Sequence, residues 1–155
     1  MARQSKQPKK ALPSDQFARI RVIYLVIIAT VALAGLADAT YLTVAHLSGD
    51  TSVCGESQGC SEVLGSAYAS MHGIPTAAFG AVGYFIAFSA ATLALYGYAR
   101  ARAFLSVVIS AMFLTTLWFL YLQAFVLHAF CPYCLLSAAI TFCLAGLLLA
   151  CPSAR

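Results

Sequence analysis

Four long apolar segments constrain this chain more than any other feature of its sequence. They run from about Val22 to Ala45, Thr76 to Tyr96, Phe104 to Leu127 and Cys131 to Ala150. About 20 helical residues cross the roughly 30 Å hydrocarbon core of a bilayer. Backbone groups cannot stay unpaired in lipid, so runs of this length must be helices. Because the connections between the later segments are short, neighbouring helices must be antiparallel. We therefore predict an all-α membrane protein, a four-transmembrane-helix bundle.

The composition supports this class. The 155 residues are 62% hydrophobic and only 9% charged, whereas about a quarter of an ordinary soluble domain is charged. We expect one membrane domain, residues 17–151, after a disordered basic tail, residues 1–16, that is rich in Lys, Gln, Ser and Pro. The tail adjoins a membrane segment and no basic surface accompanies it, which argues against nucleic-acid binding.

The arginines set the expected orientation. Those nearest the segment ends would all lie on one side of a four-span bundle: Arg19, Arg21, Arg100, Arg102 and Arg155. Positively charged loops stay in the cytoplasm. We therefore expect a multi-pass protein of the cell (inner) membrane, with both termini cytoplasmic and the large loop Ser48–Gly73 on the extracytoplasmic side.

The first segment has an alternative interpretation. A basic start, an apolar stretch and Ala37-Asp38-Ala39 resemble a cleavable signal peptide. The apolar run continues to Ala45, beyond a usual signal core, which favours a retained helix. Asp38 would then lie near the outer interface. Acidic residues in membrane helices are candidates for function, although an orienting or structural role explains Asp38 equally well.

The large loop contains a short amphipathic segment. From Cys60 to about Met71, apolar residues such as Val63 and Leu64 recur along one helical stripe. We expect a short outer-loop helix between the first two spans, lying over the mouth of the bundle as a lid. A loosely structured surface loop is the alternative.

Two cysteine pairs should meet on the outer side. Cys54 and Cys60 lie in the loop, and Cys131 and Cys134 open the fourth segment, where Pro132 suits a first helical turn. Unpaired N–H groups at that helix start favour a thiolate. A mobile pair beside a fixed pair can pass electrons by successive thiol–disulfide exchange.

Other interpretations of the cysteines remain open. The loop pair alone could be a structural disulfide, which would suit a non-catalytic four-span scaffold. All four sulfurs could hold zinc, as in a metal or thiol sensor, although the five-residue spacer fits poorly. Cys143 and Cys151 are expected to be packing residues or free thiols.

An ordered set of motifs accompanies the cysteines. It comprises Asp38-Ala-Thr-Tyr-Leu42, Cys54-x5-Cys60-Ser-Glu-Val-Leu-Gly-Ser66, Gly73-Ile-Pro75, Phe79-Gly80, Trp118-x2-Tyr121 and Phe130-Cys-Pro-Tyr-Cys134. With these motifs, residues 20–150 resemble the vitamin K epoxide reductase family, specifically a prokaryotic homologue without a fused thioredoxin-like domain.

The resemblance implies a relay. Cys54 would exchange with the thiols of a partner, Cys60 would pass electrons to Cys131, and Cys134 would react with a quinone of the vitamin K, menaquinone or ubiquinone type. The partner would be a separate thioredoxin-like extracytoplasmic protein, because this chain ends at Arg155. The activity would support disulfide bond formation. Another quinone-linked bacterial disulfide oxidase group places its C-x-x-C in the first outer loop, so the order of the motifs argues against it.

Residues beside the cysteines would form the quinone site. The expected contacts are Ser66, Thr76, Phe79, Tyr121 and Cys134. Thr76 and Ala138 stand where animal members have asparagine and tyrosine, so reduction of the epoxide is not implied. Trp118, Tyr121 and Phe125 could flank a flat ring or simply pack. His46, His72 and His128 could donate protons, but interfacial positions explain them more simply.

Overall fold

Four long helices dominate the protein. The computed structural model describes residues 14–49, 54, 58–71 and 73–151. Four helices are long and apolar enough to cross a membrane, which confirms the predicted four-span bundle. They are α1 (Ser14–Ser48), α3 (Thr76–Leu95), α4 (Ala99–Tyr121), which a π-helical turn η2 (Leu122–Val126) extends, and α5 (Pro132–Ala150).

The first helix is longer than its apolar core. It begins at Ser14 and ends at Ser48, whereas the apolar run predicted a span from about Val22 to Ala45. Hydropathy indicates which residues can lie in lipid, and a helix can continue beyond both interfaces. Residues 1–13 of the predicted disordered tail lie outside the described residues.

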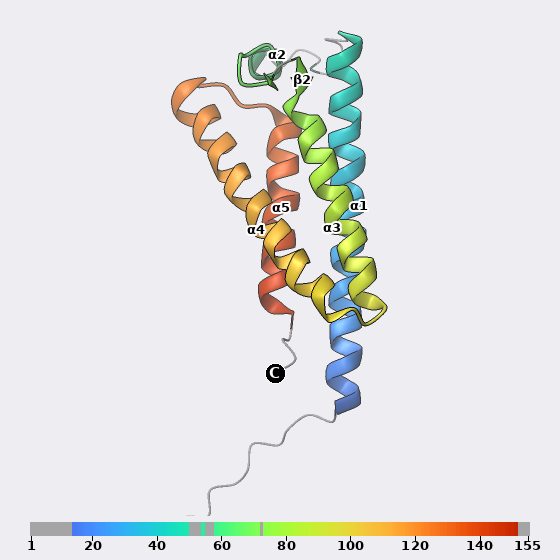
Figure 1. Ribbon diagram of the computed structural model, residues 1–155. Coiled ribbons are helices and arrows are strands. Elements are labelled where there is room, and N and C mark those ends of the chain that lie inside the picture. The colour runs from blue at the N-terminus through green and yellow to red at the C-terminus, as the bar shows by residue number, and fades with distance from the viewer. Residues whose placement is uncertain (1–13, 50–53, 55–57, 72, 152–155) are drawn as a thin grey trace, which may run out of the picture.

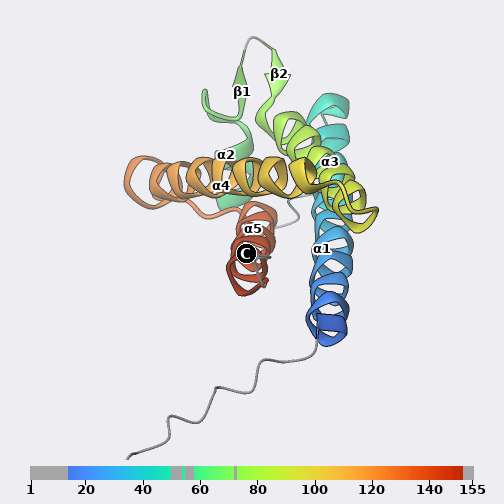
Figure 2. The ribbon, with the colours of Figure 1, turned by 60° about the horizontal axis from the view of Figure 1, so that its bottom comes forward.

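The helices form a closed ring of neighbours. α1 packs along α3, α3 contacts α4, α4 contacts α5, and α5 returns to α1. Figures 1 and 2 show α4 inclined to the other three helices. The starts of α1 and α4 lie at one end of the bundle, and the starts of α3 and α5 lie at the other (Figure 1).

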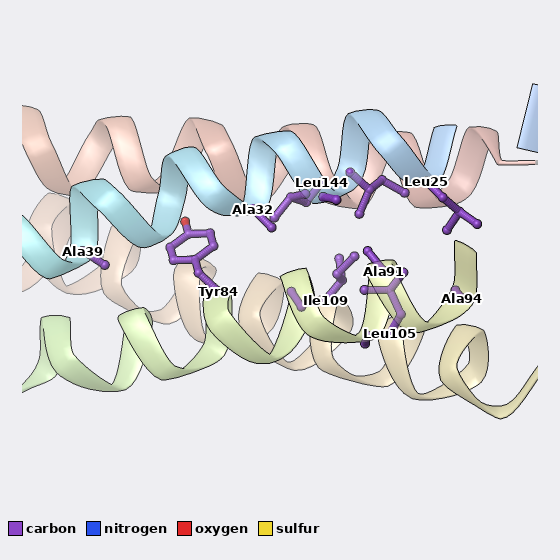
Figure 3. Packing of buried hydrophobic residues seen from close by; sticks show 13 residues of the cluster. Leu25, Ala32, Ala39, Tyr84, Ala91, Ala94, Leu105, Ile109 and Leu144 are labelled. Carbon is purple, nitrogen blue, oxygen red and sulfur yellow. The ribbon is translucent and has the colours of Figure 1, made fainter. Parts of the chain in front are cut away.

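Small side chains allow α1 and α3 to lie close together. Ala32 of α1 and Ala91 of α3 are fully buried in a cluster with Leu144 of α5 (Figure 3). Alanine and glycine permit such close helix contacts in membranes, where packing drives association. The same cluster contains Tyr84, whose ring occupies the space beside Gly35 that a Cβ atom would need.

A short helix and a two-stranded hairpin cover the end of the bundle where α3 begins (Figure 1). Helix α2 (Gln58–Leu64) confirms the predicted outer-loop helix, but it is shorter than predicted. Strand β1 (Ser70–Met71) pairs antiparallel with β2 (Ile74–Pro75). Gly65 follows α2, and glycine is a poor helix former. Turns follow at residues 65–69, and the carbonyl of Ala69 accepts hydrogen bonds from the backbone N–H and the hydroxyl of Thr76, next to the pairing of β1 with β2.

Candidate redox site

The two loop cysteines are joined in a disulfide. Cys54 and Cys60 are bonded, with Cα atoms 5.4 Å apart. Helix α2 carries Cys60, which is completely buried, and Cys54 is nearly so. Val63 and Leu64, on the following turn of α2, pack against the pair. The predicted amphipathic stripe therefore anchors the disulfide at the mouth of the bundle.

The second pair opens α5. Cys131 is the N-cap residue of the helix, Pro132 occupies its first turn, and Cys134 follows one turn inside. Cys131 is fully buried, and its Sγ atom lies 3.9 Å from Cys60 Sγ. The thiols of Cys131 and Cys134 are both free. The structure therefore brings the two pairs together and places an oxidised pair beside a reduced one.

The turn before α5 fixes the position of Cys131. The side-chain carbonyl of Gln123 accepts a hydrogen bond of 3.2 Å from the Cys131 backbone N–H. The backbone carbonyl of Gln123 accepts another from Ala129. His128 adopts a positive φ of 50° in this turn, a conformation that costs free energy for a non-glycine residue. Both bonds therefore hold a backbone bend that presents Cys131 to Cys60.

Helix α2 approaches this turn closely. A Cβ atom on Gly59 would lie 2.7 Å from the carbonyl oxygen of Phe130 and 3.1 Å from its nitrogen. Only glycine permits this separation without movement of one backbone. Gly59 precedes Cys60 and Phe130 precedes Cys131, so the close approach sets the distance between the two sulfurs.

The environment of Cys131 favours its thiolate. A hydrogen bond from the Cys134 side chain lowers the pKa of Cys131 to about 7 from an ordinary 9.0, with help from the backbone N–H groups of Tyr133 and Cys134. Burial and the negative charge of Asp38 act in the opposite direction and raise the pKa. A thiolate is the nucleophile in disulfide exchange, so Cys131 is suited to react with a neighbouring disulfide.

A cavity of about 670 Å³ adjoins the second pair. Cys134 lines it, and most of the lining is apolar. Of the residues predicted to contact quinone, the cavity lining includes Ser66, Thr76, Phe79 and Cys134.

Tyr121 lies outside the lining. It is half-exposed and stacks between Trp118 and Phe125, with ring centroids 5.9 Å and 5.1 Å away. Trp118 itself lines the cavity, so the aromatic stack adjoins the cavity through this residue.

Several polar lining residues were not identified from the sequence. Tyr84 is almost fully buried, and its hydroxyl donates to the Ser137 backbone carbonyl at 2.9 Å. The same oxygen lies 3.0 Å from Ser137 Oγ and 2.9 Å from Thr141 Oγ1. Gln123 is also buried and lines the cavity. Gln123 could have been singled out from the sequence, because it is a polar residue within a predicted membrane span.

The remaining candidates are dispersed. His46 lines the cavity, His128 is exposed, and His72 lies outside the described residues. Asp38 has one buried carboxylate oxygen without a hydrogen-bond partner among the described residues. Cys143 and Cys151 are free thiols away from both pairs. Within the described part of the chain, no group of three or more His, Cys, Asp or Glu residues could hold a metal ion.

These features define a multi-pass helical membrane protein in which a buried disulfide adjoins a free dithiol. The family model of the vitamin K epoxide reductase family matches residues 26–149, which is most of the chain, and the protein therefore belongs to that family. Membership indicates a membrane oxidoreductase with thiol-dependent redox activity. No curated protein matches the chain.

Proposed function

We propose that the protein is a membrane thiol–quinone oxidoreductase that oxidises a thioredoxin-like partner and supports disulfide bond formation in exported proteins. One arrangement carries the proposal. Cys134 lines the cavity, while Cys131, three residues earlier, lies 3.9 Å from Cys60 of the other pair. The cysteines thus form a continuous path from the loop to the cavity.

The path operates by two exchanges. A partner dithiol attacks Cys54 and reduces the Cys54–Cys60 disulfide, leaving the partner oxidised. Cys60 then attacks Cys131 of an oxidised Cys131–Cys134 pair, and Cys134 leaves as a thiolate. Cys54 resolves the Cys60–Cys131 disulfide, which restores the loop disulfide and moves two electrons to the second pair. The state described here, with the loop pair oxidised and the second pair reduced, follows this transfer.

The cavity suits a quinone of the vitamin K, menaquinone or ubiquinone type. Its volume of about 670 Å³ and its largely apolar lining accommodate a flat ring with an apolar tail. Such a quinone supplies an acceptor for two electrons and two protons. Cys134 contacts it, and Ser66, Thr76 and Phe79 lie in the same lining. Tyr121 supports the site through its ring contact with Trp118.

The expected orientation places the cysteines on the extracytoplasmic side of the cell membrane. Arg19 and Arg21 lie near the start of α1, and Arg100 and Arg102 lie in the first turn of α4, at the end of the bundle remote from α2 (Figure 1). The positive-inside rule makes that end cytoplasmic. A membrane-impermeant thiol reagent should then label Cys54 in reduced, intact cells. Labelling only after the cells are opened would contradict this orientation.

Replacement of single cysteines tests the reaction. Purified Cys134→Ala should lose reduction of a short-chain quinone by a dithiol donor, because the thiol that lines the cavity is absent. Cys143→Ala is the matched control, since Cys143 lies on the same helix outside the site, and it should retain wild-type activity. If Cys134→Ala reduced the quinone at the wild-type rate, the protein would instead be a scaffold with structural disulfides.

Trapping in cells tests the partner. In Cys60→Ala the loop disulfide cannot form, so the free Cys54 thiolate attacks the disulfide of an oxidised partner molecule and expels one of its sulfurs as a thiolate. Cys60, which would displace the partner from Cys54, is absent, so this mixed disulfide should accumulate. Mass spectrometry of the adduct should identify a protein with a thioredoxin-like fold. The double variant Cys54→Ala/Cys60→Ala should form no adduct. An adduct of the same protein in the double variant would place the exchange at another cysteine.

A further inference from the structure

Gln123 is a buried amide between Cys131 and the cavity. Its side chain lines the cavity and is only 3% exposed. Its Oε1 atom accepts the hydrogen bond from the Cys131 backbone N–H. An amide oxygen accepts and an amide nitrogen donates, so this bond determines which end of the carboxamide faces Cys131.

The other end of the carboxamide has unused donors. No described residue accepts a hydrogen bond from Gln123 Nε2. Among the described residues, Asp38 Oδ2 is the only fully buried side-chain polar atom without a partner, so Gln123 Nε2 keeps some surface toward the open space of the cavity. Since Gln123 borders the cavity, an acceptor on a molecule in the cavity can complete its bonding.

Several other polar groups in the lining are already engaged, although Thr116 and His46 also line the cavity. The hydroxyls of Ser66, Thr76 and Thr115 donate to backbone carbonyls of Val63, Ala69 and Ala111. The Tyr84 hydroxyl donates to the carbonyl of Ser137. A quinone oxygen only accepts hydrogen bonds, so it needs a donor whose proton is not already used. Gln123 offers two such protons next to the redox-active pair.

We propose that Gln123 is a quinone-recognition residue, whose Nε2 donates a hydrogen bond to the quinone carbonyl oxygen nearest the Cys131–Cys134 pair. This inference rests on the proposed function and assigns a contact within it. The same side chain holds the Cys131 backbone through Oε1, so one residue positions both the dithiol and its acceptor. A donor at this place stabilises negative charge that develops on the oxygen during reduction.

Binding measurements on two ligands test the contact. Trp118 is the only tryptophan and lines the cavity, so quenching of its fluorescence reports the Kd of a ligand there. The probes are a 1,4-naphthoquinone and a naphthalene with the same side chain, which lacks both oxygens. The wild type should prefer the quinone, and Gln123→Met should reduce that preference about tenfold, as expected for the loss of one hydrogen bond. If Gln123→Met weakened the binding of both ligands equally, the role of Gln123 would be purely structural, and this result would overturn the proposal.

Controls separate this inference from the proposed function. Ser106→Ala on the same helix, whose hydroxyl bonds only to Ala103, should leave both Kd values unchanged. A preference for the quinone that is lost in Thr116→Val but kept in Gln123→Met would also overturn the proposal.

A second measurement decides if Gln123→Met fails to fold, namely the infrared spectrum of quinone bound to the wild type. One carbonyl band should be lowered relative to apolar solvent, and two unshifted bands would refute the contact. Wild-type protein that reduces no quinone would instead refute the proposed function.

Discussion

The Sγ atoms of Cys60 and Cys131 lie 3.9 Å apart, although the two residues are 71 positions apart in the chain. Neither side chain is exposed, so the contact is shielded from water and from other thiols. Cys54 is bonded to Cys60 and Cys134 stands beside Cys131. In the proposed relay, exchange between the pairs would therefore take place at one central contact, between Cys60 and Cys131.

Removal of Cys54 should trap this contact as a covalent bond. In Cys54→Ala, oxidation forms the Cys131–Cys134 disulfide, and Cys60 attacks Cys131 and releases Cys134 as a thiolate. Cys54, which would complete the transfer by displacing Cys131 from Cys60, is absent, so only reversal by Cys134 can break the product. We expect a Cys60–Cys131 disulfide to become the main species, detected by peptide mapping under non-reducing conditions. Recovery of Cys60 as a free thiol beside an intact Cys131–Cys134 bond would contradict the relay.

Substitution of Gly59 should slow the exchange. A Cβ atom in Gly59→Ala would lie 2.7 Å from the Phe130 carbonyl oxygen, so α2 must move away from the turn that carries Cys131. Displacements near 1 Å can reduce rates greatly, and we expect a decrease of about 10- to 100-fold in the transfer between the pairs. Rapid-quench alkylation measures this step without quinone.

Gly146→Ala is the matched control for Gly59→Ala. A Cβ atom there meets nothing within 4 Å, and alanine favours a helix. The rate should remain at the wild-type value. Equal rates in Gly59→Ala and the wild type would show that the close backbone approach does not set the sulfur separation.

The pH dependence of Cys131 should reflect its lowered pKa. Because the hydrogen bond from Cys134 lowers the pKa of Cys131, its thiolate should be populated at a lower pH than that of an ordinary cysteine. The ultraviolet absorbance of the thiolate reports this in a Cys143→Ser/Cys151→Ser background. In Cys134→Ala the hydrogen bond that lowers the pKa is lost, so the midpoint should move upward. A midpoint that does not move would assign the effect to the backbone N–H groups instead.

The sequence predicted the four spans because lipid imposes a strong constraint on apolar runs. The outer-loop helix also followed from its apolar stripe, but its end at Leu64 did not. That end depends on Gly65 and on the bonds of Thr76 to Ala69, which lie seven residues apart. The pattern of apolar residues from Cys60 to Met71 cannot reveal a hydrogen bond to Thr76, because Thr76 lies outside that segment.

The candidate site was predictable where chemistry marks the residues. Cysteine spacing and topology predicted that both pairs would meet at one end of the bundle. Gln123 lies in the π-helical turn after Tyr121, which no proline or glycine marks in the sequence, and Tyr84 lies in α3. Their partners, Cys131 and Ser137, lie on another helix or at its start, so only the folded structure shows these contacts.

The Tyr84 hydroxyl should contribute to stability. It joins α3 to α5 through Ser137 and Thr141, with all three oxygens within 3.0 Å of it. Tyr84→Phe removes the hydroxyl but keeps the ring, and should lower the free energy of unfolding by about 0.5–2 kcal/mol. Denaturation in detergent micelles measures the change. An unchanged free energy of unfolding would mean that Ser137 and Thr141 form equally good hydrogen bonds with each other when the Tyr84 hydroxyl is absent.

Gly35 should be required to accommodate the Tyr84 ring. A Cβ atom at Gly35 would overlap that ring, and Tyr84 is enclosed by the core between α1 and α3. Gly35→Ala should therefore cost about 1–3 kcal/mol through overpacking, even though alanine has the better helix propensity. The loss is measured as a lower midpoint of denaturation in micelles.

A second substitution separates this overlap from other effects of Gly35→Ala. In a Tyr84→Leu background the shorter side chain leaves room for the new methyl group. Gly35→Ala should then cost less than about 1 kcal/mol, so the two changes should be strongly non-additive. Equal costs in both backgrounds would show that Gly35 serves another purpose, such as the close approach of α1 and α3. Non-additivity would establish that Gly35 on α1 leaves the space that the Tyr84 ring occupies. Gly35 would thereby also position the hydroxyl cluster of Tyr84, Ser137 and Thr141 in the lining of the cavity.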